Sequence, residues 1–162
     1  MKRIVLVLLA IFTISSARAE EYFGVRGELL FPFSGGSASA WALPEVGVQF
    51  GVDFPEYNFG FRASASTLVV AYRLALDAYA VLPIPNGSSA YFGAGAGLVG
   101  AFINVAGLQA GQALAEIRAI LGYQSNIAAF GGRFFFEFIP SFIPALSGGT
   151  FALSIGVGFN FR

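Results

Sequence analysis

Residues 44–54 read PEVGVQFGVDF, and residues 150–162 read TFALSIGVGFNFR. In the first stretch every even position from Val46 onward is large and apolar, while the odd positions hold Glu45, Gln49, Asp53 or glycine. In the second stretch the odd positions are the apolar ones. Since successive side chains of a strand point to opposite faces, each stretch predicts a β-strand with one apolar face.

Six further segments alternate in the same way. They cover residues 22–31, 57–66, 68–82, 90–104, 112–123 and 127–139. Five of the eight segments carry two charges each, and in all five the pair shares a face; the opposite faces of all eight carry no charge. The pattern predicts an all-β fold, an eight-stranded antiparallel up-and-down transmembrane β-barrel, with a reversal at the Pro83–Gly87 turn.

The segment 112–123 also fits a helix. It is built from good helix formers, and Leu114, Ile117 and Leu121 would form a helical stripe. As a strand, the segment would have Ile117 and Leu121 on one face and Glu116 and Arg118 on the other. It also lies between predicted strands in a chain that must close a barrel. We favour a strand here and keep the helix as the alternative.

The N-terminus predicts export. A basic pair at positions 2 and 3 precedes the apolar run 4–14, and an A-x-A cleavage site ends at Ala19. These features are typical of a secretory signal peptide, which we place at residues 1–19. Residues 20–162 then form a single transmembrane β-barrel domain.

The composition excludes several classes of function. Apolar residues make up 56% of the chain and charged residues 11%, against about 25% charged in soluble domains. There is no Cys and no His, so we expect no disulfide, no imidazole metal site and no cofactor. Residues 20–162 hold six Arg, no Lys and nine acids, a net charge of −3, and offer no basic patch to a nucleic acid.

The apolar face of the strands is predicted to point outward into lipid. Eleven residues at about 3.3 Å each, tilted by about 45°, span roughly 25 Å, the height of an outer-membrane apolar band. Aromatic residues would form two rims: Phe23, Phe54, Tyr57, Phe59, Phe92, Tyr123, Phe159 and Phe161 at one, and Phe31, Phe33, Trp41, Phe102, Phe138, Phe142 and Phe151 at the other. The all-β alternative is a soluble periplasmic lipocalin-like carrier, in which the two faces would be inverted.

Three features together point to a known family: the export signal, the eight alternating segments and the ending Val157-Gly-Phe159-Asn-Phe161-Arg162. In these features the chain resembles the small eight-stranded outer-membrane barrels of the outer membrane protein A and X type. The resemblance implies the outer membrane of a bacterium with a double envelope, both termini in the periplasm, membrane lipids around a monomer, and recognition of the last strand by the outer-membrane assembly machinery. Family members usually end on an aromatic residue, whereas here Arg162 follows Phe161.

An eight-stranded barrel has an interior that side chains can fill. The predicted inward charges are five bases and six acids: Arg26, Glu28, Glu45, Asp53, Arg62, Arg73, Asp77, Glu116, Arg118, Arg133 and Glu137. Buried charges must be paired, so the near balance predicts a salt-bridge network that plugs the lumen. Gly93, Gly95 and Gly97 would make room for long Arg side chains. The alternative is a narrow pore or a conduit for hydrophobic solutes.

Catalysis is not expected. No His is present to take a proton from a serine nucleophile, and a carboxylate next to Arg is a poor proton shuttle. The predicted outer connections are residues 32–43, a tight reversal near 65–67, residues 105–111 and residues 140–149, and none carries a charge. The chain is therefore predicted to be a structural barrel and not an enzyme.

Overall fold

The structure is a computed structural model that describes residues 18–34, 37–38, 42–67, 71–103, 109–127, 130–144 and 149–162. Almost all of the predicted signal peptide lies outside these residues, so its cleavage stays a prediction. Within the described part of the chain, no helix is long and apolar enough to cross a membrane.

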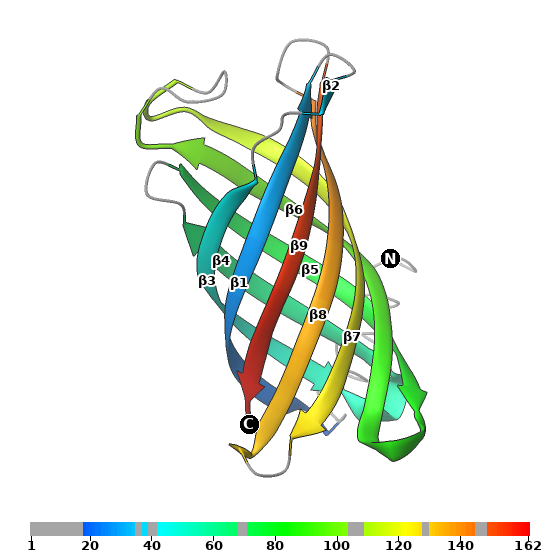
Figure 1. The fold of residues 1–162 in the computed structure, drawn as a ribbon. Coiled ribbons are helices and arrows are strands. Elements are labelled where there is room, and N and C mark those ends of the chain that lie inside the picture. The colour runs from blue at the N-terminus through cyan, green and yellow to red at the C-terminus, as the bar shows by residue number, and fades with distance from the viewer. Residues whose placement is uncertain are drawn as a thin grey trace, which may run out of the picture.

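Eight long strands form the molecule. They are β1 (Glu20–Ser34), β3 (Leu43–Phe54), β4 (Phe59–Thr67), β5 (Ala71–Ile84), β6 (Ser88–Ala101), β7 (Ala113–Ile127), β8 (Gly132–Ile143) and β9 (Thr150–Phe161). A two-residue strand, β2 (Ser37–Ala38), pairs with the end of β1. Each long strand is antiparallel to the next, and β1 also pairs with β9, so the sheet closes into the predicted barrel (Figure 1).

The two ends of the barrel differ. The start of β1 and the end of β9 lie together, as the pairing of Phe23 with Phe161 requires. The same end, which is the lower end in Figure 1, carries the 3-10 turns η1 (Pro55–Tyr57) and η2 (Pro85–Gly87). We call it the short-turn end. The strands β1, β4, β6 and β8 end at the opposite end of the barrel, which we call the long-connection end.

The segment 112–123 is a strand and not a helix. It lies in β7, which pairs with β6 along its length and with β8 on its other side. Its side chains alternate between buried and exposed, as the period of two predicts. Helix propensity differs by only a few tenths of a kcal/mol among such residues, so pairing on both edges overrides it.

Several predicted boundaries were wrong. The seventh strand begins at Gly132 and not at Ile127, which ends β7. The reversal between them includes Gly131 at φ 62°, a conformation that glycine adopts without strain. β8 also continues past Pro140 to Ile143. The proline keeps its register with β9, and only its pairing with β7 is interrupted, because proline has no amide hydrogen.

The long-connection end was also placed imprecisely. β4 extends through Thr67, so residues 65–67, near which a reversal was predicted, belong to a strand. β1 continues to Ser34, and β6 ends at Ala101, which leaves Phe102 beyond the strand. Trp41, assigned to an aromatic rim, lies outside the described residues.

The apolar faces of the strands point outward and the charged faces point inward. Phe50, Leu76 and Leu121 are among the exposed residues, with Leu76 69% accessible. The lumen holds the buried polar side chains and a few buried apolar ones. At its long-connection end lies a cluster that we call the apolar cap, formed by Val99, Ala101, Leu114 and Ile143.

Candidate functional site: the charge network in the lumen

Glu137 lies in the middle of the lumen and is fully buried. β8 directs its carboxylate inward, where Oε2 accepts a hydrogen bond from Arg26 Nη2 of β1 at 3.0 Å. Its other oxygen, Oε1, accepts hydrogen bonds from Arg62 Nη1 of β4 and from the Tyr91 hydroxyl of β6, the latter at 2.5 Å. One carboxylate therefore ties together four strands that enclose the lumen.

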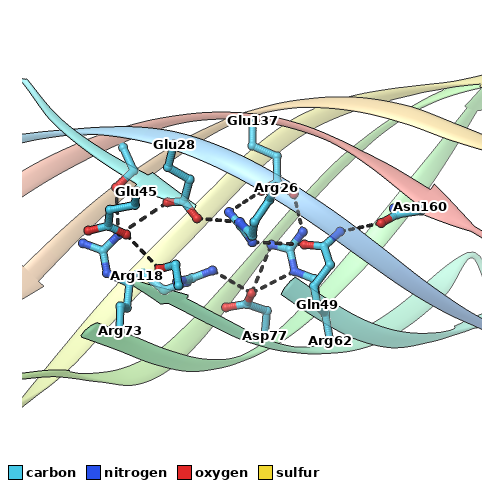
Figure 2. Close-up of polar contacts among 12 residues, drawn as sticks. Arg26, Glu28, Glu45, Gln49, Arg62, Arg73, Asp77, Arg118, Glu137 and Asn160 are labelled. Atoms are coloured by element: carbon cyan, nitrogen blue, oxygen red, sulfur yellow. Dashed lines mark hydrogen bonds and ion pairs between the residues drawn. The ribbon is translucent and has the colours of Figure 1, made fainter. Parts of the chain in front are cut away.

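Asp77 of β5 is the second acceptor in this middle section. Its Oδ2 accepts a hydrogen bond from Arg62 Nη2 at 3.0 Å and from Arg118 Nη2 of β7 at 2.8 Å. Arg62 thus lies between Asp77 and Glu137, and its guanidinium crosses the lumen from β4 (Figure 2). A planar guanidinium with several donors suits this bridging role better than an ammonium would.

Nearer the long-connection end, three carboxylates surround Arg73 of β5. Arg73 Nε lies 3.0 Å from Glu116 Oε2, and Nη1 lies 3.4 Å from both Glu28 Oε2 and Glu45 Oε2. Glu28 also pairs with Arg26 through its other oxygen, at 2.5 Å. Glu28 therefore joins this outer section to the middle section (Figure 2).

Nine of the eleven predicted residues form one connected network. Its members are Arg26, Glu28, Glu45, Arg62, Arg73, Asp77, Glu116, Arg118 and Glu137. Every one is 5% accessible or less. Four arginines face five acids, so the network has a net charge of −1. Neutral side chains extend it, since Gln49 accepts from Arg26 and donates to Asn160.

The other two predicted residues lie apart, at the short-turn end. Arg133 Nη1 is 2.8 Å from Asp53 Oδ2, and the arginine side chain is 18% accessible. Arg162 joins this cluster by pairing with Glu20 at 2.7 Å. Neither terminal residue was among the predicted lumen charges. Both ends of the barrel domain thus meet in a mouth cluster formed by Glu20, Asp53, Arg133 and Arg162.

Three tyrosines also belong to the lumen, although the predicted lumen residues were charged ones alone. Tyr79 shares the inward face of β5 with Arg73 and Asp77; it donates to Asp53 at 2.6 Å, and the hydroxyls of Tyr79 and Tyr22 lie 2.9 Å apart. Tyr91 bonds Glu137. Tyr22 shares its face with Arg26, and Tyr91 shares its face with the β6 glycines, so strict use of the alternation would have found both.

The glycines of β6 allow close approach of the neighbouring strand β5. Gly93 lies against Tyr79, where a Cβ atom would come within 2.7 Å of the tyrosine Cβ. Gly95 lies against Asp77, and its Cβ would also come within 2.5 Å of the Leu76 carbonyl oxygen. The atoms nearest to a Cβ at these glycines belong to β5 side chains and backbone, because each glycine lies directly opposite a β5 residue. Gly95 also lies directly opposite Arg118 of β7, so room for an Arg side chain stays a prediction.

Gly122 of β7 provides the first mutational prediction. The Tyr91 ring covers this glycine so closely that a Cβ would overlap it. Gly122→Ala should displace Tyr91 from Glu137 and lower the free energy of unfolding by about 1–3 kcal/mol, the usual cost of overpacking. Gly27→Ala is the control, since the nearest atom to its Cβ is 4.0 Å away. Denaturant unfolding in detergent micelles measures both, and equal losses would contradict this packing.

The charged side chains of the network are held in ion pairs across the lumen. Its carboxylates and guanidiniums are paired with one another. The chain contains no histidine, so no serine of the lumen has a histidine beside it. Across the described ranges, no group of three or more acidic side chains is arranged as a metal site. Pairing of this kind fixes side chains across the barrel and fills its interior.

No protein-family model matches the chain, and no curated protein matches it. Several solved structures match the chain in fold. Neisserial surface protein A matches with a TM-score of 0.72 at 11% identity, over 90% of this chain and 99% of that chain. The N-terminal β-barrel domain of Pseudomonas aeruginosa OprF matches with a TM-score of 0.53 at 20% identity, over 85% of this chain and 97% of that one.

A third match is Ail, the attachment invasion locus protein of Yersinia pestis, solved in complex with the heparin analogue sucrose octasulfate. Its TM-score is 0.52 at 14% identity, over 89% of this chain and 99% of that chain. At such identities the likeness concerns the fold alone. The fold is that of the eight-stranded outer-membrane barrels, which confirms the predicted fold class and the resemblance in architecture.

Proposed function

We propose that this chain is a structural barrel of a bacterial outer membrane, without catalytic activity, whose lumen is plugged by salt bridges. The observation that carries the proposal is the single network of nine buried charges that spans the lumen from β1 to β8. A water-filled channel would leave such side chains exposed, and here each of them is almost wholly buried.

The exterior supports a lipid environment. Large apolar side chains are exposed on every long strand, among them Val48, Phe61 and Ile117, while the nine charges of the network lie inside. A soluble lipocalin-like carrier would have the opposite arrangement, with the apolar face filling the lumen. The inverted faces therefore argue against the soluble alternative and favour membrane lipids as the surroundings.

We further propose a periplasmic location for both termini, on the side of the short turns. The beginning of β1 and the end of β9 lie at the same end of the barrel, together with η1 and η2. Outer-membrane barrels carry short turns on the periplasmic side and longer loops outside. All long strand edges are paired with one another, which is consistent with a monomer.

The last strand is the proposed contact with the outer-membrane assembly machinery. Phe159 and Phe161 both face outward on β9, and their rings lie 4.9 Å apart. Arg162, which follows this pair, is bound to Glu20 of β1 at 2.7 Å. Phe161→Ala should therefore reduce the amount of folded protein in the outer membrane of cells, while purified protein should refold in detergent as wild type does. Unchanged membrane levels would contradict the role of the last strand.

Two measurements test the proposal as a whole. The full chain should migrate with the outer-membrane fraction and show heat-modifiable mobility in detergent gels, whereas a protein that stays soluble without detergent would overturn the membrane assignment. Proteoliposomes should not swell in solutions of small sugars or amino acids, with a porin as the positive control. Swelling would favour the pore alternative over the plug.

A further inference from the structure

The short-turn end of the barrel, the lower end in Figure 1, contains a pocket of about 340 Å³, at the lower end of the range for ligand pockets. Two larger hollows, which share Val48 and Leu74, lie on the lipid-facing side of the strands and have a predominantly apolar lining. The pocket at the short-turn end differs from them in its polar lining. We call it the mouth pocket; η1 and η2 border it, and its lining includes Asp53, Pro83, Ser89, Gln124, Asn126 and Arg133.

The register of β5 to β8 builds the polar wall of the mouth pocket. Ser89 of β6 lies directly between Pro83 of β5 and Gln124 of β7. Two residues further along β7, Asn126 lies directly opposite Arg133 of β8. Since positions i and i+2 of a strand share a face, Gln124 and Asn126 present their two amide groups to the pocket about 7 Å apart along the strand.

Each of these two amides is held through one atom and has its other atom free. Gln124 is 7% accessible; its Nε2 donates to the Ser89 hydroxyl at 2.9 Å, and its Oε1 accepts no hydrogen bond from the described residues. Asn126 Oδ1 accepts a hydrogen bond from Arg133 Nε at 3.2 Å, and its Nδ2 donates to none of the described residues. The mouth pocket therefore offers one oriented acceptor and one oriented donor.

The charges that border the mouth pocket cancel each other. Among the described residues that line it, Asp53 and Arg133 are the ionisable ones, and Arg133 Nη1 lies 2.8 Å from Asp53 Oδ2. The other oxygen of Asp53 accepts a hydrogen bond from the Tyr79 hydroxyl at 2.6 Å. A charged ligand would have to break this ion pair or lose its water without gaining a counter-charge, and both are costly. The mouth pocket is therefore suited to a neutral ligand.

An apolar side chain of the same wall separates the mouth pocket from the charge network. Val81 lines the pocket on the inward face of β5 and packs against a buried cluster formed by Tyr79, Tyr91 and Ile120. This cluster bonds Asp53 through Tyr79 and Glu137 through Tyr91, so it lies between the pocket and the middle of the lumen. The pocket thus ends at the cluster, which favours binding over passage.

We propose that the mouth pocket binds a neutral saccharide of one or two pyranose rings. Sugar hydroxyls both donate and accept hydrogen bonds, so one ring can donate to Gln124 Oε1 and accept from Asn126 Nδ2. The C–H face of the ring packs against Val81 and Pro83, and the ligand needs no charge. The inference goes beyond the plugged barrel, and it does not depend on which side of the membrane the short-turn end faces.

Saturation-transfer NMR on the refolded full chain tests the site. The detergent is a polyoxyethylene ether, because an alkyl glycoside would itself carry the ligand. Glucose and maltose should bind with dissociation constants on the order of millimolar. Gln124→Leu removes the free acceptor and should weaken binding about tenfold. Gln112→Leu makes the same substitution just before β7, at the long-connection end, and should leave binding unchanged. Wild-type protein that gives no signal with either sugar would overturn the site.

A second variant tests the donor at an exposed position, where the fold is not at risk. Asn126→Asp keeps an oxygen for Arg133 Nε but replaces the free Nδ2 donor by an acceptor. Its heat-modifiable mobility should match that of wild type, while its affinity for glucose should fall about tenfold. If both Asn126→Asp and Gln124→Leu bind glucose as wild type does, the sugar lies elsewhere and the assignment to the mouth pocket is wrong.

Charged and peptide analogues test the class of ligand. Glucuronate and protonated glucosamine resemble glucose but carry a charge, so each should bind about tenfold more weakly or worse. Glucuronate that binds more tightly than glucose would make the pocket an anion site at Arg133. Tighter binding of N-acetylglycinamide, a neutral peptide, would make it a peptide site. Either result overturns the proposal.

A longer sugar distinguishes the two sources of a neutral saccharide. Maltotetraose that binds more tightly than glucose would support the proposal with the end of a glycan chain as the ligand. Weaker binding of maltotetraose would support it with a free sugar as the ligand. In both cases Gln124→Leu should weaken the binding of the preferred sugar about tenfold, and an unchanged affinity would contradict the site.

Discussion

Glu137→Ala is expected to lower the free energy of unfolding by about 3–5 kcal/mol, the cost of removing one partner from a buried ion pair. The substitution withdraws the carboxylate that holds Arg26, Arg62 and Tyr91 together. Arg62 keeps Asp77 and Arg26 keeps Glu28, but the lumen then carries an excess of buried donors. Urea unfolding of the protein in lipid vesicles measures the loss.

Glu137→Gln is the matched control. The glutamine oxygen can still accept from Arg62 and Tyr91, but the amide nitrogen cannot accept from Arg26 and the charge is lost. The loss should therefore fall to about 1.5–3 kcal/mol, the usual contribution of hydrogen bonds to charged groups. A Glu137→Ala protein as stable as wild type would mean that the network fills space without holding the strands together. A loss of the same size in both variants would assign the effect to charge alone.

Leu76→Arg should cost about 2–4 kcal/mol in bilayers, since it places a charge on the lipid face near the middle of a membrane-spanning strand. Leu76 lies near the centre of β5 and is 69% accessible, so no packing is lost. Leu82→Arg is the control, because Leu82 lies on the same face of the same strand nearer the short-turn end. There the cost should be about 0–1 kcal/mol.

The difference in stability between Leu76→Arg and Leu82→Arg depends on whether lipid or water surrounds the barrel. In water, an exposed Leu→Arg substitution changes stability by only about 0.5 kcal/mol at either position. Small and equal effects would therefore contradict a lipid-facing exterior. Vesicle-based unfolding, with the two variants measured side by side, distinguishes these outcomes.

The features that depend on a period of two could be predicted from the sequence. The alternation in residues 44–54 and 150–162 places Glu45 and Asp53 inside and Phe151 and Phe161 outside, as the structure has them. The same rule identified the inward charges, because a charge on the lipid face of any strand would be costly. Fold class and the charged interior thus follow from one repeating pattern.

Register and pairing partners could not be predicted in this way. The alternation places Arg62 and Glu137 on inward faces, yet they are 75 residues apart in the chain and meet only because β4 and β8 face each other across the lumen. The role of Gly95 depends equally on its position opposite Asp77. Strand ends were imprecise because a β-strand can include a proline such as Pro140 when only one neighbour loses a bond.

The terminal arginine illustrates the same limit. Arg162 departs from the usual aromatic ending, and nothing in the local sequence explains it. In the folded barrel it lies beside Glu20, the first residue of β1, and near Asp53 of β3. A residue at one end of the barrel domain therefore has partners at the other end, which only closure of the β1–β9 seam brings together.

Single-channel recording in planar bilayers tests the closed lumen most directly. The full-length protein, refolded and inserted in symmetric KCl, should give no reproducible conductance steps, because nine buried charges and the apolar cap occupy the lumen. Reproducible steps whose size changes with Arg73→Ala or Glu116→Gln would show that ions pass through the network itself, and would contradict the plugged barrel.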